Sequence, residues 1–355
     1  MISLFIATDK KRYNFVTSLN VTTTVADIGA RYGIHPSWNG YDAPLRYIAF
    51  EPDAEEAARL RSLYQTTAVF SYEVLETALD KTKGERDFHL LKHRGLSSCL
   101  KPDLTSECFR HLKPGQAEIE KVLRIKTERA DDIFGKLGVV PDFLKVDTEG
   151  TEQDVIEGCE GLLAEGVLGV RSSCNFQPCF IGQRLFSETH EYLMARGFVL
   201  LNLDYKGFGY PRLGLFRKPD PTENEDSRYG ILVAADAVWI LRPDALDNSV
   251  PGDQAIVSRL KLSAFCFFNN APDVAIDLLR EGAEAGQFTA GIQATRLYKM
   301  LRLRSARFLG RYRTVPDEQW ERASGIFGSI FGEPLSGGSG FYPQISAWVR
   351  DMAAS

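Results

Sequence analysis

The pattern of apolar and polar positions changes character near residue 245. From residue 22 to about residue 242, short apolar runs rich in β-branched residues alternate with segments whose apolar residues recur at helical spacing. Such alternation is typical of an α/β fold, in which helices connect parallel strands and cover a doubly wound sheet. We therefore predict a doubly wound, mainly parallel sheet within residues 1–245.

The predicted strands differ in their expected burial. Residues 141–147 are nearly apolar throughout, which is typical of a strand in the centre of a sheet. Residues 86–92 follow a polar turn and are expected to form a hairpin with the strand before them. The predicted strands are residues 22–29, 45–53, 72–79, 86–92, 141–147, 167–173, 199–204 and 236–243.

Three helices are predicted between these strands. The helix over residues 53–65 begins with the residue spacing of a capping box. Residues 148–166 place several apolar side chains on one helical face. Residues 185–198 form a further amphipathic segment, in which Gly197 is expected to end the helix.

The last third of the chain has a different pattern. From residue 254 onward the apolar residues recur at helical spacing, and no strand pattern is present. Two of these helices are expected to form a hairpin with its turn at residues 270–272. We predict an all-helical extension over residues 246–355. Its role stays open, because a lid over a substrate and a surface for a homodimer or another partner fit the same pattern.

Charge and hydropathy limit the expected partners. The 355 residues carry a formal net charge of −5 without a block of like charges, which argues against nucleic acid as a partner. No apolar run approaches the roughly 20 residues of a membrane-spanning helix, and the N-terminus lacks the order of a signal peptide. Residues 296–313 are basic and are interpreted as an amphipathic helix. A site for a membrane surface or an anionic partner is the alternative for this segment.

Six cysteines do not form a disulfide framework in a chain of this length. They include no C-x-x-C pair, and Cys174 and Cys179 have no histidine near them in the sequence, so a zinc site is not expected. We predict free thiols and a location in the reducing cytoplasm.

A glycine-containing turn follows the first predicted strand, with the pattern Asp27, Gly29 and Gly33. It differs from the dinucleotide pattern G-x-G-x-x-G, because Arg31 stands where the middle glycine lets the backbone approach a pyrophosphate. This large side chain argues against NAD or FAD as the ligand. The anionic Asp27 instead suits a ligand with an ammonium group. A turn that binds no ligand is the alternative.

Glu51 ends the second predicted strand, 22 residues after Gly29. A carboxylate at this position can accept hydrogen bonds from both hydroxyls of a ribose. The alternative is a surplus charge near the next helix, which Pro52 and Asp53 already open. Because the glycine turn lies at the matching distance, we favour the ribose interpretation.

Two further acids follow the predicted central strand. Asp147 and Glu149 come directly after it, at the carboxyl edge of the sheet where open α/β folds bind ligands. Both can face the same crevice only if the chain turns there, which Gly150 permits. They would then serve as a general base or hold a substrate hydroxyl. The alternative is that they only supply favourable charge near a helix N-terminus.

These segments together resemble the FkbM family of S-adenosylmethionine-dependent methyltransferases. The resemblance covers roughly residues 22–240 and rests on the segments VADIGARYGIHPSW, YIAFEPD, VLETALDKTKGERDFHL, GLSSCL, DFLKVDTEGTE and LFSETHEYLMARGFVLLNLD. Their order and spacing are more specific than those of a generic nucleotide-binding fold. The resemblance implies a class I methyltransferase (Rossmann-like) sheet, with S-adenosylmethionine across the carboxyl ends of the strands.

The resemblance also implies which residues bind this cofactor. Asp147 and Glu149 match the D-x-E-G segment of the family. The cofactor-binding residues would be Asp27, Gly29 and Gly33 at the methionine end, Glu51 at the ribose with Asp53 close by, and Ala78 and Leu79 along the adenine.

The acceptor is less well defined by the resemblance. Members of the family methylate hydroxyl oxygens of sugars, glycans or polyketides, so O-methylation of such an acceptor is the expected activity. One segment departs from the family, because residues 171–173 read Arg-Ser-Ser where members commonly carry an acidic residue. We therefore do not transfer a substrate from the family to this chain.

An O-methyltransferase needs a base that shares the proton of the acceptor hydroxyl during attack. Asp147 and Glu149 are the first candidates, and His35 on the glycine turn is the third. Packing beside Pro36 and Trp38 explains His35 equally well. No third ligand accompanies the two acids, so we predict a metal-independent enzyme.

Two other classes of protein are alternatives to a methyltransferase. A nicotinamide-dependent oxidoreductase would need a phosphate close to Arg31, whose side chain obstructs that approach. A non-catalytic scaffold with a helical interaction module is the second alternative. The glycines and acids that remain in place argue against it.

Overall fold

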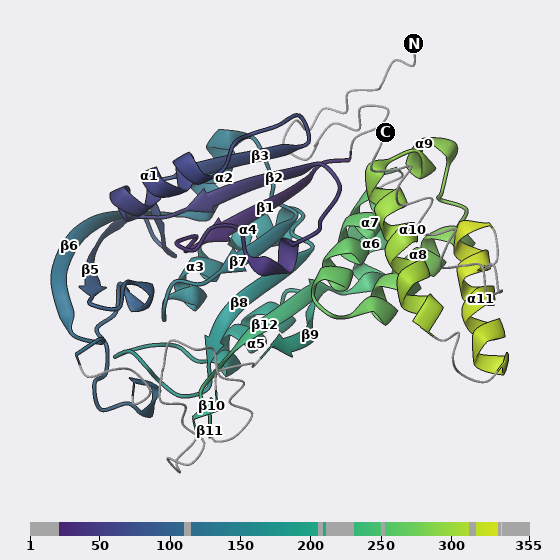
Figure 1. Cartoon of the computed structure of the whole chain (residues 1–355). Helices are drawn as coiled ribbons and strands as arrows, with labels where there is room; N and C mark the ends of the chain where they lie inside the picture. Colours follow the sequence, from purple (N-terminus) through teal and green to yellow (C-terminus); the bar gives the residue numbers. More distant parts are fainter. Residues whose placement is uncertain are drawn as a thin grey trace. The chain divides into compact units, whose positions relative to one another are not determined.

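The computed structural model describes residues 21–109, 115–204, 209–210, 231–249, 253–311, 317–332 and 335. The chain forms two compact units, Met1–Pro251 and Gly252–Ser355. Figure 1 shows that the first contains the strands, together with several helices, and that the second is helical. The assignment of separate domains with a limit at residue 245 stays a prediction.

Among the described residues, a sheet of seven strands in the order β3-β2-β1-β7-β8-β12-β9 forms the centre of the first unit. The strands from β3 to β8 are parallel, whereas β12 is antiparallel to both of its neighbours. The predicted α/β fold with a mainly parallel sheet is therefore confirmed, and β7, which was predicted to be central, lies in its middle. The strands are β1 (Thr23–Ile28), β2 (Leu45–Phe50), β3 (Phe70–Leu75), β7 (Phe143–Val146), β8 (Gly169–Asn175), β9 (Phe198–Asp204) and β12 (Ala234–Leu241).

Helices pack on this sheet through a shared apolar core. Successive strand residues point to opposite faces, and alternate residues such as Ile28, Phe50 and Val146 are buried in one cluster with Phe134 and Ile156 from helices. Helix α1 begins at an N-cap aspartate, as its capping pattern predicts. The helices are α1 (Ala54–Leu63), α2 (Ala130–Leu137), α3 (Glu152–Glu157), α4 (Glu160–Glu165) and α5 (Phe186–Met194).

A second sheet, in the order β4-β6-β5, corrects two predictions. The strand expected over residues 72–79 is divided, because the chain turns at Thr77, whose N–H donates to the carbonyl of Leu75 at 3.0 Å. The segment after the turn enters the second sheet as β4. Strand β5 forms its hairpin with β6, which sequence analysis missed, and not with the strand before it. The strands are β4 (Ala78–Leu79), β5 (Gly84–Leu91) and β6 (Ile119–Glu128), and a separate antiparallel pair consists of β10 (Gly209–Tyr210) and β11 (Ile231–Leu232).

The single helix predicted over residues 148–166 is wrong in its length. The chain forms α3 and α4, which are interrupted at Gly158. A Cβ at Gly158 would lie only 2.3 Å from the carbonyl oxygen of Asp80, so the chain passes too close to the turn after β4 for a larger residue. The predicted apolar face is nevertheless buried, including Val155 and Leu162.

The second unit consists of helices in its described part. Helices α7 and α8 form the predicted hairpin, and Asn270 in its turn adopts a positive φ of 60°. The basic segment forms α10, which buries Leu297 and Leu301 and so has the predicted amphipathic character. No helix in the described parts of the chain is long and apolar enough to span a membrane. The helices are α7 (Asp253–Phe268), α8 (Pro272–Glu284), α9 (Ala290–Gln293), α10 (Arg296–Leu309) and α11 (Asp317–Phe331), and α6 (Pro243–Ser249) belongs to the first unit.

The prediction that all cysteines are free thiols is wrong for two of them. Cys108, in the 3-10 helix η3 (Glu107–Phe109), forms a disulfide with Cys179. The two segments lie side by side, and the N–H of Asp103 donates to the carbonyl of Cys179 at 2.9 Å. The disulfide weighs against the predicted cytoplasmic location, because cytoplasmic thiols are kept reduced. That location stays a prediction.

Candidate active site

A pocket lies at the carboxyl ends of β1, β2 and β7, the edge at which open α/β sheets bind ligands. It encloses about 670 Å³, including space that is open to solvent. Further parts of its wall come from β4, β5, β6 and the 3-10 helix η2 (Arg94–Leu96). The pocket thus joins both sheets of the first unit.

The two glycines of the turn after β1 are required by their protein neighbours. Gly29 has a φ of 81°, and a Cβ on it would lie 1.8 Å from the carbonyl oxygen of Asp147. Gly33 has a φ of 84°, and its Cβ would lie 2.4 Å from the hydroxyl of Tyr64. Gly29 is part of the pocket wall, whereas Gly33 is not among the residues that line it. The pattern Asp27-Gly29-Gly33 therefore reflects close packing as much as a ligand.

Asp27 is not among the lining residues of the pocket. Its side chain is 0% exposed, and its Oδ2 accepts a hydrogen bond from the hydroxyl of Tyr47 at 2.5 Å. Its Oδ1 lies 3.0 Å from the ammonium nitrogen of Lys145. The expectation that Asp27 contacts an ammonium group of a ligand is therefore corrected, because a lysine of the chain itself already provides that charge.

Glu51 lines the pocket and is 3% exposed, and its contact with a ribose stays a prediction. Its Oε1 accepts the N–H of Asp53 at 2.9 Å and lies 3.8 Å from the guanidinium of Arg31. Burial raises the pKa of Glu51 to about 7, although these two contacts favour its charged form. The carboxyl group is thus fixed at the end of β2 and close to its protonation midpoint at neutral pH.

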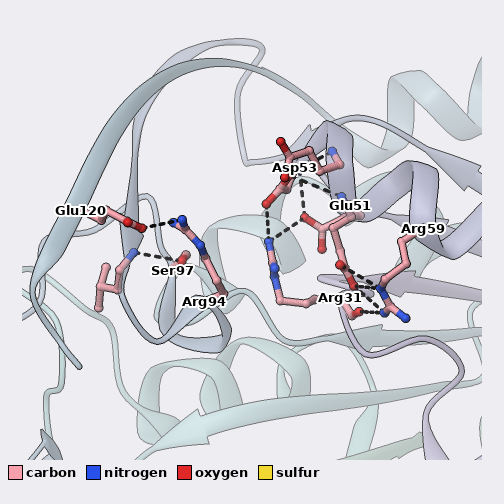
Figure 2. Close-up of polar contacts among 10 residues, drawn as sticks. Arg31, Glu51, Asp53, Arg59, Arg94, Ser97 and Glu120 are labelled. Atoms are coloured by element: carbon pink, nitrogen blue, oxygen red, sulfur yellow. Dashed lines mark hydrogen bonds and ion pairs between the residues drawn. The ribbon is translucent and has the colours of Figure 1, made fainter. Parts of the chain in front are cut away.

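Arg31 links the turn to helix α1, as Figure 2 shows. Its guanidinium donates to Oδ2 of Asp53 at 2.7 Å, and its carbonyl accepts from Arg59 at 3.0 Å. Asp53 also caps α1 through the N–H groups of Glu55 and Glu56. It therefore lies close to Glu51, as expected, without lining the pocket. The side chain of Arg31 does line it, which agrees with the steric argument against a pyrophosphate at this turn.

Ala78 and Leu79 both line the pocket, as expected for an adenine wall. The second sheet adds Phe88 and Ile125 to the lining residues, which sequence analysis did not identify. The missing signal is the strand β6, whose pairing with β5 brings these side chains to the pocket.

The 3-10 helix η2 and the tip of the glycine turn also contribute to the wall. Arg94 pairs with Glu120 of β6, and Ser97 accepts the N–H of Leu91 (Figure 2). Tyr32 is 74% exposed although it lines the pocket. Ser97 belongs to the segment GLSSCL and Tyr32 to the segment VADIGARYGIHPSW, which both carry the family resemblance, although neither residue was assigned a role from the sequence.

The turn after β7 brings Asp147 and Glu149 to the pocket together. Glu149 has a φ of 56°, a conformation that side chains other than glycine rarely adopt. The carboxylate of Glu152 stabilises this turn, since it accepts the N–H of Thr148 at 2.9 Å and that of Gly150 at 2.9 and 3.0 Å. Glu152 was not predicted as a site residue. Its hydrogen bonds hold the turn in the conformation in which Asp147 and Glu149 both line the pocket.

These acids have raised pKa values. Desolvation, followed by the charges of Asp147 and Glu152, holds the pKa of Glu149 well above its usual range. Desolvation also raises the pKa of Asp147, whereas the ammonium of Lys145 acts in the opposite direction. The nearby cation therefore favours Asp147 as the ionised member of the pair and Glu149 as the protonated one.

His35 is not among the residues that line this pocket. It caps the 3-10 helix η1 (Pro36–Trp38), where its Nδ1 accepts the N–H of Ser37 at 3.1 Å. Its Nε2 lies 3.7 Å from Oδ2 of Asp236 on β12. The His35 ring therefore contacts groups of the chain itself, and its role as a base stays a prediction.

Arg171, which departs from the family pattern, is paired with acids of neighbouring strands. Its guanidinium donates to Oδ2 of Asp236 at 2.7 and 3.2 Å and to Oδ2 of Asp204 at 3.4 Å. Despite desolvation, His35 and Arg171 lower the pKa of Asp236. The positive charge at residue 171 is therefore compensated within the protein. No group of three or more His, Cys, Asp or Glu in the described residues is arranged to hold a metal ion.

A search of curated proteins found no match. The chain resembles the FkbM methyltransferase from Methylobacillus flagellatus KT at 14% identity and a TM-score of 0.35, over 65% of this chain and 47% of that one. It also resembles a protein from Listeria monocytogenes assigned as an S-adenosylmethionine-dependent methyltransferase, at 9% identity and a TM-score of 0.32, over 62% and 91% of the two chains.

The chain thus spans about half the length of the Methylobacillus protein. The family of FkbM methyltransferase domains matches residues 27–206, which include the glycine turn, Glu51, the second sheet and the turn after β7. This match covers just over half of the chain. The protein therefore belongs to the FkbM methyltransferase family.

Proposed function

We propose that this methyltransferase uses S-adenosylmethionine and methylates a hydroxyl oxygen of a sugar, a glycan or a polyketide-like natural product. The observation that carries the cofactor proposal is the buried carboxyl group of Glu51 in the wall of the pocket, next to the apolar Ala78 and Leu79. An acid and an apolar wall at the ends of successive strands suit a ribose and its adenine.

The pocket residues fit this cofactor. Phe88 and Ile125 extend the apolar wall beside Leu79, where a purine ring would pack. At the methionine end, the turn at Gly29 and the carboxylate of Asp147 line the pocket. We propose that Asp147, in place of Asp27, contacts the ammonium group of the cofactor.

The residues around Asp147 suit a proton transfer. When bound, S-adenosylmethionine supplies a methyl group that is already activated by the sulfonium, so the protein mainly has to orient the acceptor and take up its proton. We propose that the ionised Asp147 accepts this proton. Glu149, whose pKa is raised well above its usual range, would donate a hydrogen bond to the acceptor in its protonated form. His35 remains a third candidate for the base.

The helices after residue 246 have no residue among those that line the pocket. We propose that they form a surface for a homodimer or another protein partner. This proposal and the domain limit at residue 245 rest on the sequence pattern and on the separate apolar core of the helices.

A ligand titration tests the cofactor proposal. Thermal shift measurements with S-adenosylmethionine, S-adenosylhomocysteine and NAD should show stabilisation by both adenosyl ligands and none by NAD. Glu51→Gln should weaken S-adenosylhomocysteine binding by about tenfold or more, since the loss of a charge-assisted hydrogen bond costs about 1.5–3 kcal/mol. The matched control is Glu55→Gln, two residues into α1 on an exposed side chain.

Stabilisation by NAD alone would refute the proposal. Equal affinities of Glu51→Gln and Glu55→Gln would show that the ribose assignment is wrong while leaving the cofactor itself in place. Asp147→Asn should weaken S-adenosylhomocysteine binding, because the carboxylate that contacts the ammonium group is lost, and it should also lose methyl transfer to the acceptor when the cofactor is saturating.

A further inference from the structure

Lys145 is a buried cation in the middle of the sheet. It lies within the segment DFLKVDTEGTE, but no role was assigned to it from the sequence. It lies on β7, between Asp27 of β1 and Arg171 of β8 in the strand register. Its side chain is 11% exposed. A lysine inside an otherwise apolar central strand must be compensated by nearby acceptors, because an isolated buried charge is strongly unfavourable.

The ammonium of Lys145 contacts three parts of the site at once. Its Nζ donates to the carbonyl oxygen of Gly29 at 2.9 Å and lies 3.0 Å from Oδ1 of Asp27. It also lies 3.5 Å from Oδ2 of Asp147. The glycine turn, a fully buried acid and the acid that lines the pocket therefore share one cation.

The two acids differ in what they face. Asp27 is 0% exposed and has Tyr47 as its second partner, so its carboxylate contacts protein groups. The side chain of Asp147 is 37% exposed and lines the pocket. Lys145 therefore connects a buried anchor to a carboxylate that can meet a ligand. The same ammonium fixes the carbonyl of Gly29, whose Cα is pressed against the backbone of Asp147.

We propose that Lys145 is the positioning residue of this site: its ammonium joins the glycine turn to Asp147 and directs the Asp147 carboxylate into the pocket. Asp27 serves as the buried counter-charge that holds Lys145 in place. This inference rests on the proposed function for the identity of the ligand, but the positioning itself concerns only contacts within the chain.

The titratable groups that face Asp147 come from several elements, and any pH effect has to include them all. Lys145 favours the charged form of Asp147, and its own pKa is raised by Asp27 and Asp147 although burial acts against it. The groups that oppose this charge or are affected by it are Asp27 on β1, Tyr32 on the glycine turn, Glu149 and Glu152 after β7, and Asp236 on β12. Removal of Lys145 leaves only acidic neighbours in this set.

Two variants test the proposal. Lys145→Met keeps the length of the side chain and removes the ammonium, but it also leaves Asp27 buried without a partner and risks misfolding. The double variant Asp27→Asn with Lys145→Met removes the buried pair together. It preserves the net charge, the shape of residue 27 and an acceptor for the Tyr47 hydroxyl. Any effect on Asp147 in this variant therefore comes from the loss of the Lys145 ammonium, and not from an unpaired charge on Asp27.

S-adenosylhomocysteine binding is measured by calorimetry from pH 6 to pH 8.5. Glu51, whose pKa is about 7, titrates within this range in both proteins, so the measurement compares the two affinities at each pH. The double variant should bind about tenfold more weakly than the wild type at pH 6, and the difference should narrow as the pH rises, because loss of the ammonium favours the protonated form of Asp147. Equal affinities of the two proteins at every pH would overturn the proposal.

Hydrogen exchange provides a readout that needs no ligand. Without the bond from Lys145 to the carbonyl of Gly29, the amides of residues 29–33 should exchange faster in the double variant than in the wild type. Unchanged exchange there would also overturn the proposal. If the wild type does not bind S-adenosylhomocysteine, the proposed cofactor fails while this exchange measurement still decides the role of Lys145.

Discussion

At the scale of single residues, the site shows how one motif can have two causes. Gly29 and Gly33 are required by Asp147 and Tyr64, which leave no room for a side chain. Asp27 belongs to the same motif but contacts Tyr47 and Lys145 inside the protein. The motif is thus explained in part by close packing of the turn against its protein neighbours. Gly29 in this turn also lines the pocket in which a ligand would bind.

Substitution of Gly29 separates the packing requirement from the backbone conformation. Gly29→Ala combines a positive φ with a Cβ 1.8 Å from a backbone oxygen, and it should cost at least about 3 kcal/mol of unfolding free energy. The matched control is Gly138→Ala, at the end of α2, which has a φ of 65° and no heavy atom within 4 Å of the added Cβ. It should cost about 1–2 kcal/mol.

Urea unfolding of both variants gives the comparison. Equal losses for Gly29→Ala and Gly138→Ala would mean that the turn after β1 relaxes away from Asp147, and the close approach would then not be essential to the fold.

At the scale of elements, the turn after β7 and the segments that pack against it form one structure. The carboxylate of Glu152 fixes Gly150, and a Cβ on Gly150 would lie 2.9 Å from the ring of Phe180. Phe180 follows directly after Cys179, whose disulfide holds this loop to Cys108. The loop that the disulfide holds therefore packs, through Phe180, against the turn that carries Asp147 and Glu149.

Loss of this disulfide should destabilise the first unit. The bond closes a loop with a sequence separation of 71 residues, and disulfides of this kind typically contribute about 2–4 kcal/mol. The double variant Cys108→Ser with Cys179→Ser should lose an amount in this range in urea unfolding. The matched control, Cys99→Ser, replaces a free and partly exposed cysteine and should change stability by less than about 1 kcal/mol.

A reducing agent gives an independent check of the same bond. Dithiothreitol should lower the melting temperature of the wild type and leave that of the double serine variant unchanged. If it affects neither protein, the two cysteines are not paired in solution, and the predicted free thiols would be restored.

At the scale of the whole molecule, the described pocket residues all belong to the first unit. The helices of the second unit have their own buried residues, including Leu260, Phe265, Leu279 and Leu301. If these helices form a lid, a bound ligand should slow their hydrogen exchange. If they form a surface for a partner, the ligand should leave their exchange unchanged.

Hydrogen exchange with and without S-adenosylhomocysteine distinguishes the two roles. Protection should be confined to pocket segments of the first unit, such as residues 28–33, 50–52 and 147–151, because ligand contacts slow local opening there. Helices α7 to α10 should show no change. Protection of these helices without any change in the oligomeric state would instead assign them the role of a lid.

Much of this protein can be predicted from its sequence. The period of two in the strands and the helical spacing between them predict the α/β sheet, because a buried face imposes its own periodicity on the chain. Five residues that were predicted to belong to the site line the pocket, and their roles in binding and catalysis stay predictions: Glu51, Ala78, Leu79, Asp147 and Glu149. These residues directly follow or belong to strands, and the carboxyl ends of parallel strands necessarily meet at one edge of the sheet.

Other features depend on contacts between residues that are distant in the sequence. The pairing of β5 with β6, the Cys108–Cys179 disulfide and the ion pair between Lys145 and Asp27 join segments whose proximity no local pattern encodes. The pattern of residues along the chain was enough to predict the sheet, the edge at which a ligand is expected and the family. The contact of Asp27 with Lys145 could not be predicted in this way, because a buried charge pairs with whichever opposite charge lies nearest in space. For the same reason it could not be foreseen that Asp147, and not Asp27, lines the pocket.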